Sequence, residues 1–232
     1  MKHVLIFIGI IFCSLSVSGQ SSFWDDWLIV VRDVMLRDVS FDDKMAETRE
    51  MISSANASQD TFHMLCGQGI LFHLYKSQVD YGKAKIALVR AMEIAEATGR
   101  KEYIGFVHHK FGSLELNLSN YSEALKQYRL AISLCSISGD SMCLALSLDQ
   151  AGAMTSQLQN SFSAYGNEDS AKLYLSQSLQ YFELASPLVA RYASDRAQAS
   201  HINNFASMLS MSDQPDLAIP YYQKIGRASC RE

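Results

Sequence analysis

The side chains best suited to chemistry in this sequence are the adjacent His108 and His109, followed directly by Lys110. Imidazoles bind metal ions and transfer protons, but neighbouring residues of a helix point about 100° apart and cannot converge on one ligand. His63 and Cys66 have a helical i, i+3 spacing, yet two ligands do not complete a zinc site. We therefore predict no metal site. We expect His108 to face the packed side of its helix and His109 to face a groove.

Paired carboxylates offer a second kind of chemistry. The pairs Asp25-Asp26 and Asp42-Asp43 stand where helices are expected to begin, so their charges are explained by the positive end of the helix dipole. The sequence contains no glycine-rich phosphate loop, HExxH motif or GxSxG motif. We expect no catalytic residue, no cofactor and no enzyme activity. A non-catalytic portion of a truncated enzyme is the most distant alternative.

The elements that position these side chains follow from an internal repeat. The segment Asn120–Asp140 repeats the plan of an earlier segment at a fixed offset of 40 residues. Corresponding residues are Tyr81 and Tyr121, Ala84 and Ala124, Leu88 and Tyr128, Ala91 and Ala131, and Gly99 and Gly139. Similarity at a fixed period marks one helical unit that is stacked on copies of itself. A hydrophobic content of 48% and only three prolines suit such an array.

Apolar residues at three-to-four-residue spacing predict the individual helices. After an N-terminal pair within residues 22–58, helices are expected at Asp60–Ser77, Tyr81–Ala97, Glu102–Leu118 and Tyr121–Ser136. Gly99 is expected to end its helix in the left-handed conformation. A third unit places Ala151-Gly152 before Ala171, with the polar stretch Asn160–Ser170 as a long loop and Asp169 or Ser170 as the next cap.

The pattern resembles the tetratricopeptide repeat, in which a Leu-Gly pair in the first helix is followed by Ala-x3-Phe in the second. Phe111-Gly112 and Ala124-x3-Tyr128 match these positions, with twelve residues from Gly112 to Ala124. His108 replaces the usual Trp, Glu115 replaces the usual Tyr, and the period is 40 residues instead of about 34. The resemblance implies an all-α, right-handed α-solenoid of antiparallel helix pairs with about ten helices.

The resemblance also implies roles for individual residues. The residues expected to pack the repeats together are Leu71, Ala84, Leu88, Ala91, Phe111, Gly112, Ala124, Tyr128, Ala131, Gly152, Ala171, Phe205, Ala206, Ala218 and Tyr222. The residues expected to face a concave binding groove are His73, Lys76, His109, Asn117, Asp149, Gln157 and Asn203. Their mixed charge favours a protein or peptide partner.

The two ends of the chain have a different character. Residues 1–19 have the charged start, apolar run and small residues of a secretory signal peptide. The last eight residues, 225–232, resemble a translated sequencing adapter, and the repeat pattern stops at Ile225. We therefore expect a leader (1–19), a capping helix pair (22–58), about four repeats with the last truncated (60–224), and a non-native tail (225–232).

The cysteines leave two interpretations open. Setting aside Cys13 in the leader and Cys230 in the tail leaves Cys66, Cys135 and Cys143, an odd number that lies in or beside helices. Buried free thiols are the favoured interpretation. A bridge between Cys135 and Cys143 across one turn is the alternative in an oxidising compartment.

Charge and leader together suggest where the chain acts. A formal net charge of −4 without a basic cluster disfavours nucleic-acid binding by this fragment. We expect an exported protein, periplasmic or extracytoplasmic, with membrane association only through the leader or a missing C-terminal part. The favoured function is the sensory part of a bacterial signal-transduction protein, resembling those with repeats before a kinase or DNA-binding output. The alternative is a soluble periplasmic or surface adaptor without an output domain.

Overall fold

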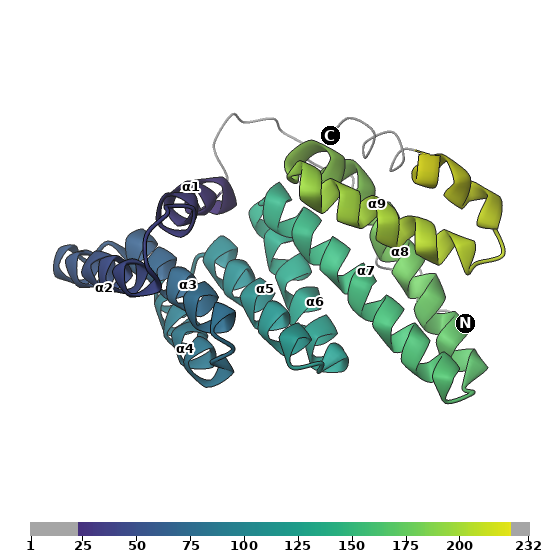
Figure 1. The fold of residues 1–232 in the computed structure, drawn as a ribbon, viewed down its shortest axis with the longest axis horizontal. Coiled ribbons are helices and arrows are strands. Elements are labelled where there is room, and N and C mark those ends of the chain that lie inside the picture. The colour runs from purple at the N-terminus through teal and green to yellow at the C-terminus, as the bar shows by residue number, and fades with distance from the viewer. Residues whose placement is uncertain (1–22, 224–232) are drawn as a thin grey trace.

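The computed structural model describes residues 23–223, which form nine α-helices and one short 3₁₀ helix. In chain order these are α1 (Phe23–Met35), α2 (Phe41–Ser58), α3 (Thr61–Ser77), α4 (Tyr81–Thr98), α5 (Lys101–Asn117), α6 (Tyr121–Ser138), α7 (Ser141–Ala164), α8 (Glu168–Tyr192), α9 (Asp195–Ser210) and η1 (Pro215–Ala218). The expected leader and tail lie outside the described residues. Consecutive helices pack against each other in an all-α helical repeat solenoid, which confirms the predicted fold class (Figure 1).

The turns between helices are set by residues that satisfy free backbone groups. The carboxylates of Asp60, Asp80 and Asp140 each accept a hydrogen bond from the backbone N–H three residues later, at 3.1, 3.0 and 2.9 Å. Gly99 and Gly139 end α4 and α6 at φ 66° and 77°, a conformation that glycine adopts without steric cost. The prediction for Gly99 is therefore confirmed, and the repeat of its position at Gly139 has the same physical reason.

The expected long loop at residues 160–170 is wrong. Only residues 165–167 connect α7 to α8, and these helices have 24 and 25 residues. The polar residues continue the two helices, and the rings of Phe162 and Tyr174 stack between them with their centroids 5.3 Å apart. The cap of α8 is Asn167, whose side chain accepts from the N–H of Ser170.

The lengthened hairpin changes which residues face Gly152. A Cβ at Gly152 would lie 2.9 to 3.0 Å from the ring of Phe182, and the hydroxyl of Ser178 donates to the Gly152 carbonyl at 2.9 Å. Ser178 and Phe182 therefore hold the positions that Ala124 and Tyr128 hold in the preceding unit. Ala171 is buried, as expected, but it is not the partner of Gly152.

The other residues predicted to pack the repeats together can be compared with their burial in the structure. Phe111 is half-buried, and the expected packing residues other than Phe111 and Tyr222 are buried. Tyr222 is 44% exposed, so its predicted packing role is wrong. Tyr221 takes that role, with its ring centroid 5.1 Å from that of Phe205. The 3₁₀ helix η1 has about 3.0 residues per turn and not 3.6, which changes the register that a regular α-helix would have had.

Gly112 provides a test of how closely α5 and α6 approach. A Cβ at this position would lie 2.7 to 2.8 Å from three ring carbons of Tyr128, which is buried and cannot move aside. We expect Gly112→Ala to lower the free energy of unfolding by about 1–3 kcal/mol through overpacking. Chemical denaturation followed by far-UV circular dichroism measures this change.

Gly82 is the matched control, because a Cβ there meets only a carboxylate oxygen of Asp80 at 3.6 Å. Gly82→Ala should raise stability by up to about 1 kcal/mol, since alanine loses less backbone entropy in a helix. Equal effects of the two substitutions would contradict the close approach at Gly112.

Candidate binding groove

The odd-numbered helices form the inner surface of the solenoid. The backbones of α3, α5, α7 and α9 approach one another in succession. Among residues 23–223 no two even-numbered helices bring their backbones as close, although Arg129 of α6 reaches α8 with its long side chain and donates to Tyr181 and Gln177. Helices that are closer together line the concave side of a curved array. We call the surface formed by α3, α5, α7 and α9 the inner groove.

Helix α1 lies in this inner groove. It contacts α3, α5 and α7, which belong to three successive helix pairs, as well as its neighbour α2. Trp24 and Trp27 are 2% and 3% exposed. The ring centroid of Trp24 lies 4.8 Å from that of His109, and the centroid of Trp27 lies 5.7 Å from that of His73. The floor of the groove at α3 and α5 is thus covered by the chain itself.

A buried cation lies beneath α1. Lys110 is 5% exposed, and its Nζ lies 4.0 Å from the ring centroid of Trp27 and 4.8 Å from that of Trp24. Burial, with a smaller contribution from the charge of Lys76, holds the pKa of Lys110 well below its usual value. Aromatic faces attract an ammonium group but accept no conventional hydrogen bond from it.

The two predicted groove histidines are neutral groups in this floor. Burial, assisted by the charges of Lys110 and Lys76, holds the pKa values of His73 and His109 well below the usual 6.5. Nδ1 of His109 lies 3.0 Å from the hydroxyl oxygen of Ser147 on α7. His109 does lie on the inner side of α5, but the expectation that it faces an open groove is wrong because α1 covers it.

The remaining predicted groove residues fall into two groups. Asn117, Gln157 and Asn203 are exposed, each on a different odd-numbered helix. Lys76 is half-buried and donates to the hydroxyl of Ser113 at 3.3 Å. Part of the inner groove is therefore covered by α1, and the groove position of the three exposed residues stays a prediction.

The prediction that Asp149 faces the binding groove is wrong, because Asp149 is 6% exposed and faces the core. Its carboxylate lies 2.8 Å from Nδ1 of His201, and Nε2 of His201 lies 2.8 Å from the hydroxyl oxygen of Ser186. Sequence analysis missed this set because its members come from α7, α8 and α9 and have no local motif. His201 could have been found only as a polar residue on an otherwise apolar helix face.

The order Ser186, His201, Asp149 is that of a serine-hydrolase triad. Acyl transfer also needs backbone or side-chain donors for an oxyanion. Ser186 lies inside helix α8 and is followed by Pro187, which has no N–H to donate, and its hydroxyl donates to the Phe182 carbonyl at 2.8 Å. We interpret the three residues as a hydrogen-bonded connection that fixes α9 to α7 and α8.

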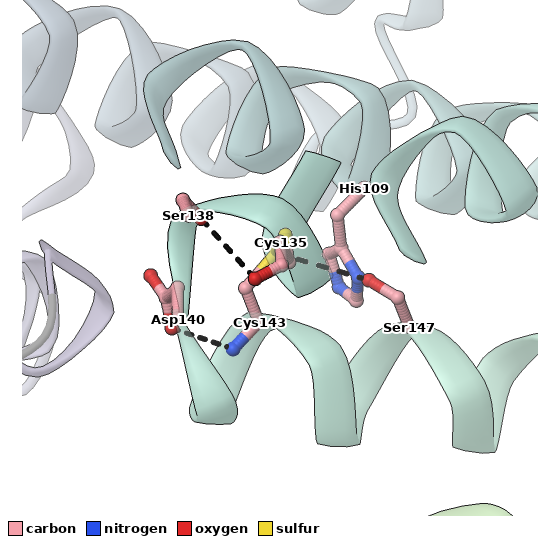
Figure 2. Close-up of a disulfide and its surroundings, with 6 residues drawn as sticks. All are labelled: His109, Cys135, Ser138, Asp140, Cys143 and Ser147. Carbon is pink, nitrogen blue, oxygen red and sulfur yellow. Dashed lines mark hydrogen bonds between the residues drawn. A yellow bond between two sulfur atoms is a disulfide. The ribbon is translucent and has the colours of Figure 1, made fainter. Parts of the chain in front are cut away.

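A disulfide joins the end of α6 to the start of α7. Cys135 and Cys143 form this bond with their Cα atoms 5.9 Å apart, next to His109 and Ser147 (Figure 2). The favoured prediction of free thiols is therefore wrong for these two residues, and the alternative holds. The turn at Asp140 brings the two cysteines together by folding one helix back on the other. Cys66 is free and buried, and burial raises the pKa of its thiol to about 12.

The described residues offer neither a metal-ligand cluster nor a membrane-spanning helix. No group of three or more His, Cys, Asp or Glu side chains among residues 23–223 could hold a metal ion. His63 lies 2.7 Å from a carboxylate oxygen of Asp60, its own helix cap. Among these residues, no helix combines the length and apolar character that crossing a membrane requires.

Comparisons with known proteins support the fold alone. No protein-family model matches the chain, and no curated protein matches it significantly. Among solved structures, the crystal structure of BtubC (BKLC) from P. vanneervenii is similar to this chain, with a TM-score of 0.50 and 17% sequence identity. The similarity covers 82% of this chain and 75% of that chain. At this identity it supports the helical repeat architecture and carries no statement about activity or partners.

Proposed function

We propose that this protein is a scaffold that binds a protein or peptide partner in its inner groove. The observation that carries the proposal is that the groove accommodates a helical segment, α1, across three helix pairs. The exposed Asn117, Gln157 and Asn203 extend the same surface with side chains that donate and accept hydrogen bonds. A polypeptide is the ligand class whose length and mixed polarity suit such an extended surface.

We further propose a role for the scaffold outside the cytoplasm. The repeats are of the tetratricopeptide type, and the chain is the exported sensory part of a bacterial signal-transduction protein. Support comes from the signal-peptide pattern of residues 1–19 and from the disulfide, because disulfides persist in oxidising compartments. The function is binding, without catalysis and without nucleic acid as a ligand.

An independent read of the coding sequence beyond Tyr222 tests this role. A span of about 20 apolar residues followed by a kinase or DNA-binding pattern is expected. A coding sequence that ends after one or two further repeats would instead indicate an exported adaptor.

The binding surface is tested with a peptide selected from a phage-displayed library on the wild-type protein. Replacing Asn117, Gln157 and Asn203 with Arg should weaken its binding by at least about tenfold, since each side chain would block the open groove. The matched control replaces Ser54, Ser136 and Gln180, exposed residues of the outer helices α2, α6 and α8, with Arg.

Fluorescence anisotropy with a labelled peptide measures all three proteins. The control variant should bind like the wild type. Loss of binding by the control, or full binding by the groove variant, would contradict the inner groove as the binding surface.

A further inference from the structure

Helix α1 differs from the other helices in how it is held. Its side toward the inner groove carries Phe23, Trp24 and Trp27, which pack on α3 and α5, whereas Leu28 and Ile29 on its other side are 40% and 60% exposed. The connection to α2 comprises only residues 36–40. It is thus a single amphipathic helix laid on a surface that three helix pairs build.

The fit of α1 is good in shape. Gly69 leaves the space that Trp27 fills, because a Cβ at Gly69 would lie 3.0 Å from Nε1 of Trp27. The rings of Phe23, Trp24 and Trp27 all lie within 5.2 Å of the Phe106 ring between their centroids. Burial of the three large aromatic side chains, and of Val34 at 1% exposure, stabilises the docked helix.

The fit of α1 is poor in polarity. Nε1 of Trp27 and Nε2 of His73 are both buried without a hydrogen-bond partner. Nζ of Lys110 lies 4.0 Å from the Trp27 ring, among aromatic faces that accept no conventional hydrogen bond. A buried polar group without a hydrogen-bond partner destabilises the arrangement that holds it. The two unpaired atoms and the Lys110 side chain lie at one position of α1, that of Trp27.

A carboxylate at the Trp27 position would satisfy this site. It would accept hydrogen bonds from the Lys110 ammonium and from His73 as an Nε2–H donor, and it would remove the unpaired indole N–H. The aromatic contacts of Trp24 with His109 and Phe106 would be kept by an aromatic residue at that position. A helix of this composition fits the groove floor better in polarity than α1 does.

We propose that α1 is an intramolecular ligand of the inner groove, and that the partner is an amphipathic helix with an aromatic residue and, three positions later, a carboxylate. Binding of the partner displaces α1 and exposes Trp24 and Trp27. The proposal rests on the proposed binding function and adds the partner's chemistry and its regulation. Tethered α1 competes at an effective concentration on the order of 1 mM, so only a ligand with a better fit displaces it.

The tryptophans make displacement directly measurable, because the chain has two Trp residues and both lie on α1. The probe is a synthetic peptide of residues 23–38 with Trp24→Phe and Trp27→Glu, which contributes no tryptophan emission. Its addition to the full-length protein should shift tryptophan emission to the red while far-UV circular dichroism, corrected for the peptide, stays constant. A comparison peptide carries Phe at both positions.

The role of the cation is tested by Lys110→Met. For each peptide, the measured quantity is the concentration that displaces α1 from half of the protein. Lys110→Met should raise this concentration for the Glu-containing peptide about tenfold more than for the comparison peptide, because only the Glu-containing peptide loses a charge-assisted hydrogen bond. Lys85→Met, at an exposed lysine of the outer helix α4, is the matched control and should change neither concentration.

Three results would overturn the proposal. In the first, the peptide binds but tryptophan emission does not change. In the second, the red shift is accompanied by a loss of helicity. In the third, Lys110→Met has the same effect on both peptides. If the library-selected peptide still binds at Asn117, Gln157 and Asn203, the groove remains the binding surface and only the role of α1 fails. If neither kind of peptide binds, both proposals fail.

Discussion

Acidification from pH 7 to pH 5 is expected to lower the free energy of unfolding by up to about 4 kcal/mol, about 2 kcal/mol for each of His73 and His109. Both side chains are neutral in the folded protein because burial holds their pKa values well below 6.5. The unfolded chain, with pKa values near 6.5, binds more protons below that pH. Stability is therefore fully present above pH 6.5 and is lost as the pH falls.

Other groups also bear on the pH dependence of stability. Lys76 and Lys110 act on both imidazoles through their charges, and His109 also acts on His73. Trp24 from α1 and Ser147 from α7 are neutral contacts of His109. Burial also lowers the pKa of Lys110 from its usual value. Burial raises the pKa of Asp140, whose protonation opposes the loss.

A double variant separates the histidines from these groups. His73→Gln with His109→Gln keeps Lys110 and Asp140 in place and should remove the histidine part of the pH dependence. Urea denaturation at several pH values between 5 and 7 measures it, and tryptophan emission reports whether α1 leaves first. A double variant that loses as much stability as the wild type would show that the two histidines are already charged or exposed in the folded state.

Local sequence signals predicted most of the helices correctly. The repeat at 40 residues and the helix end at Gly99 depend on nearby residues, so their structural consequence can be derived from the sequence. The close contact between Gly112 and Tyr128 is of the same kind, because both residues lie within one helix pair joined by a short turn. Helices α7 and α8 are longer than those of the preceding pair. There the repeat pattern predicted Ala171 as the packing partner of Gly152, whereas the partner in the structure is Ser178.

The candidate site was harder to predict because it depends on contacts between distant segments. The sequence shows α1 as an amphipathic helix at the start of the chain, and it contains no local signal that this helix crosses three later helix pairs. The positions of His73 and His109 on the inner side were predictable from the repeat. Their burial was not, because the aromatic residues that cover them come from α1. The same holds for the contact of Asp149 with His201 across 52 residues.

Reduction of the Cys135–Cys143 bond is expected to lower the free energy of unfolding by about 2.5 kcal/mol, the chain-entropy value for a loop of about eight residues. The sequence separation of 8 gives a small loop, so the effect is modest compared with that of a long-range bridge. Both cysteines are fully buried, and a reductant reaches the bond only when the turn between α6 and α7 opens. The protein should therefore be unfolded with reductant, refolded and then titrated with urea, beside an oxidised sample.

The double variant Cys135→Ala with Cys143→Ser is the control, since its stability should not respond to reductant. Cys66→Ala should respond like the wild type, because Cys66 forms no bond. Equal stability of reduced and oxidised wild-type protein would contradict a contribution of the bond.

The bond closes the turn beside His109 and Ser147, which lie in the groove floor. A reduced protein that also shows red-shifted tryptophan emission before unfolding would therefore connect the redox state of the turn to the docking of α1.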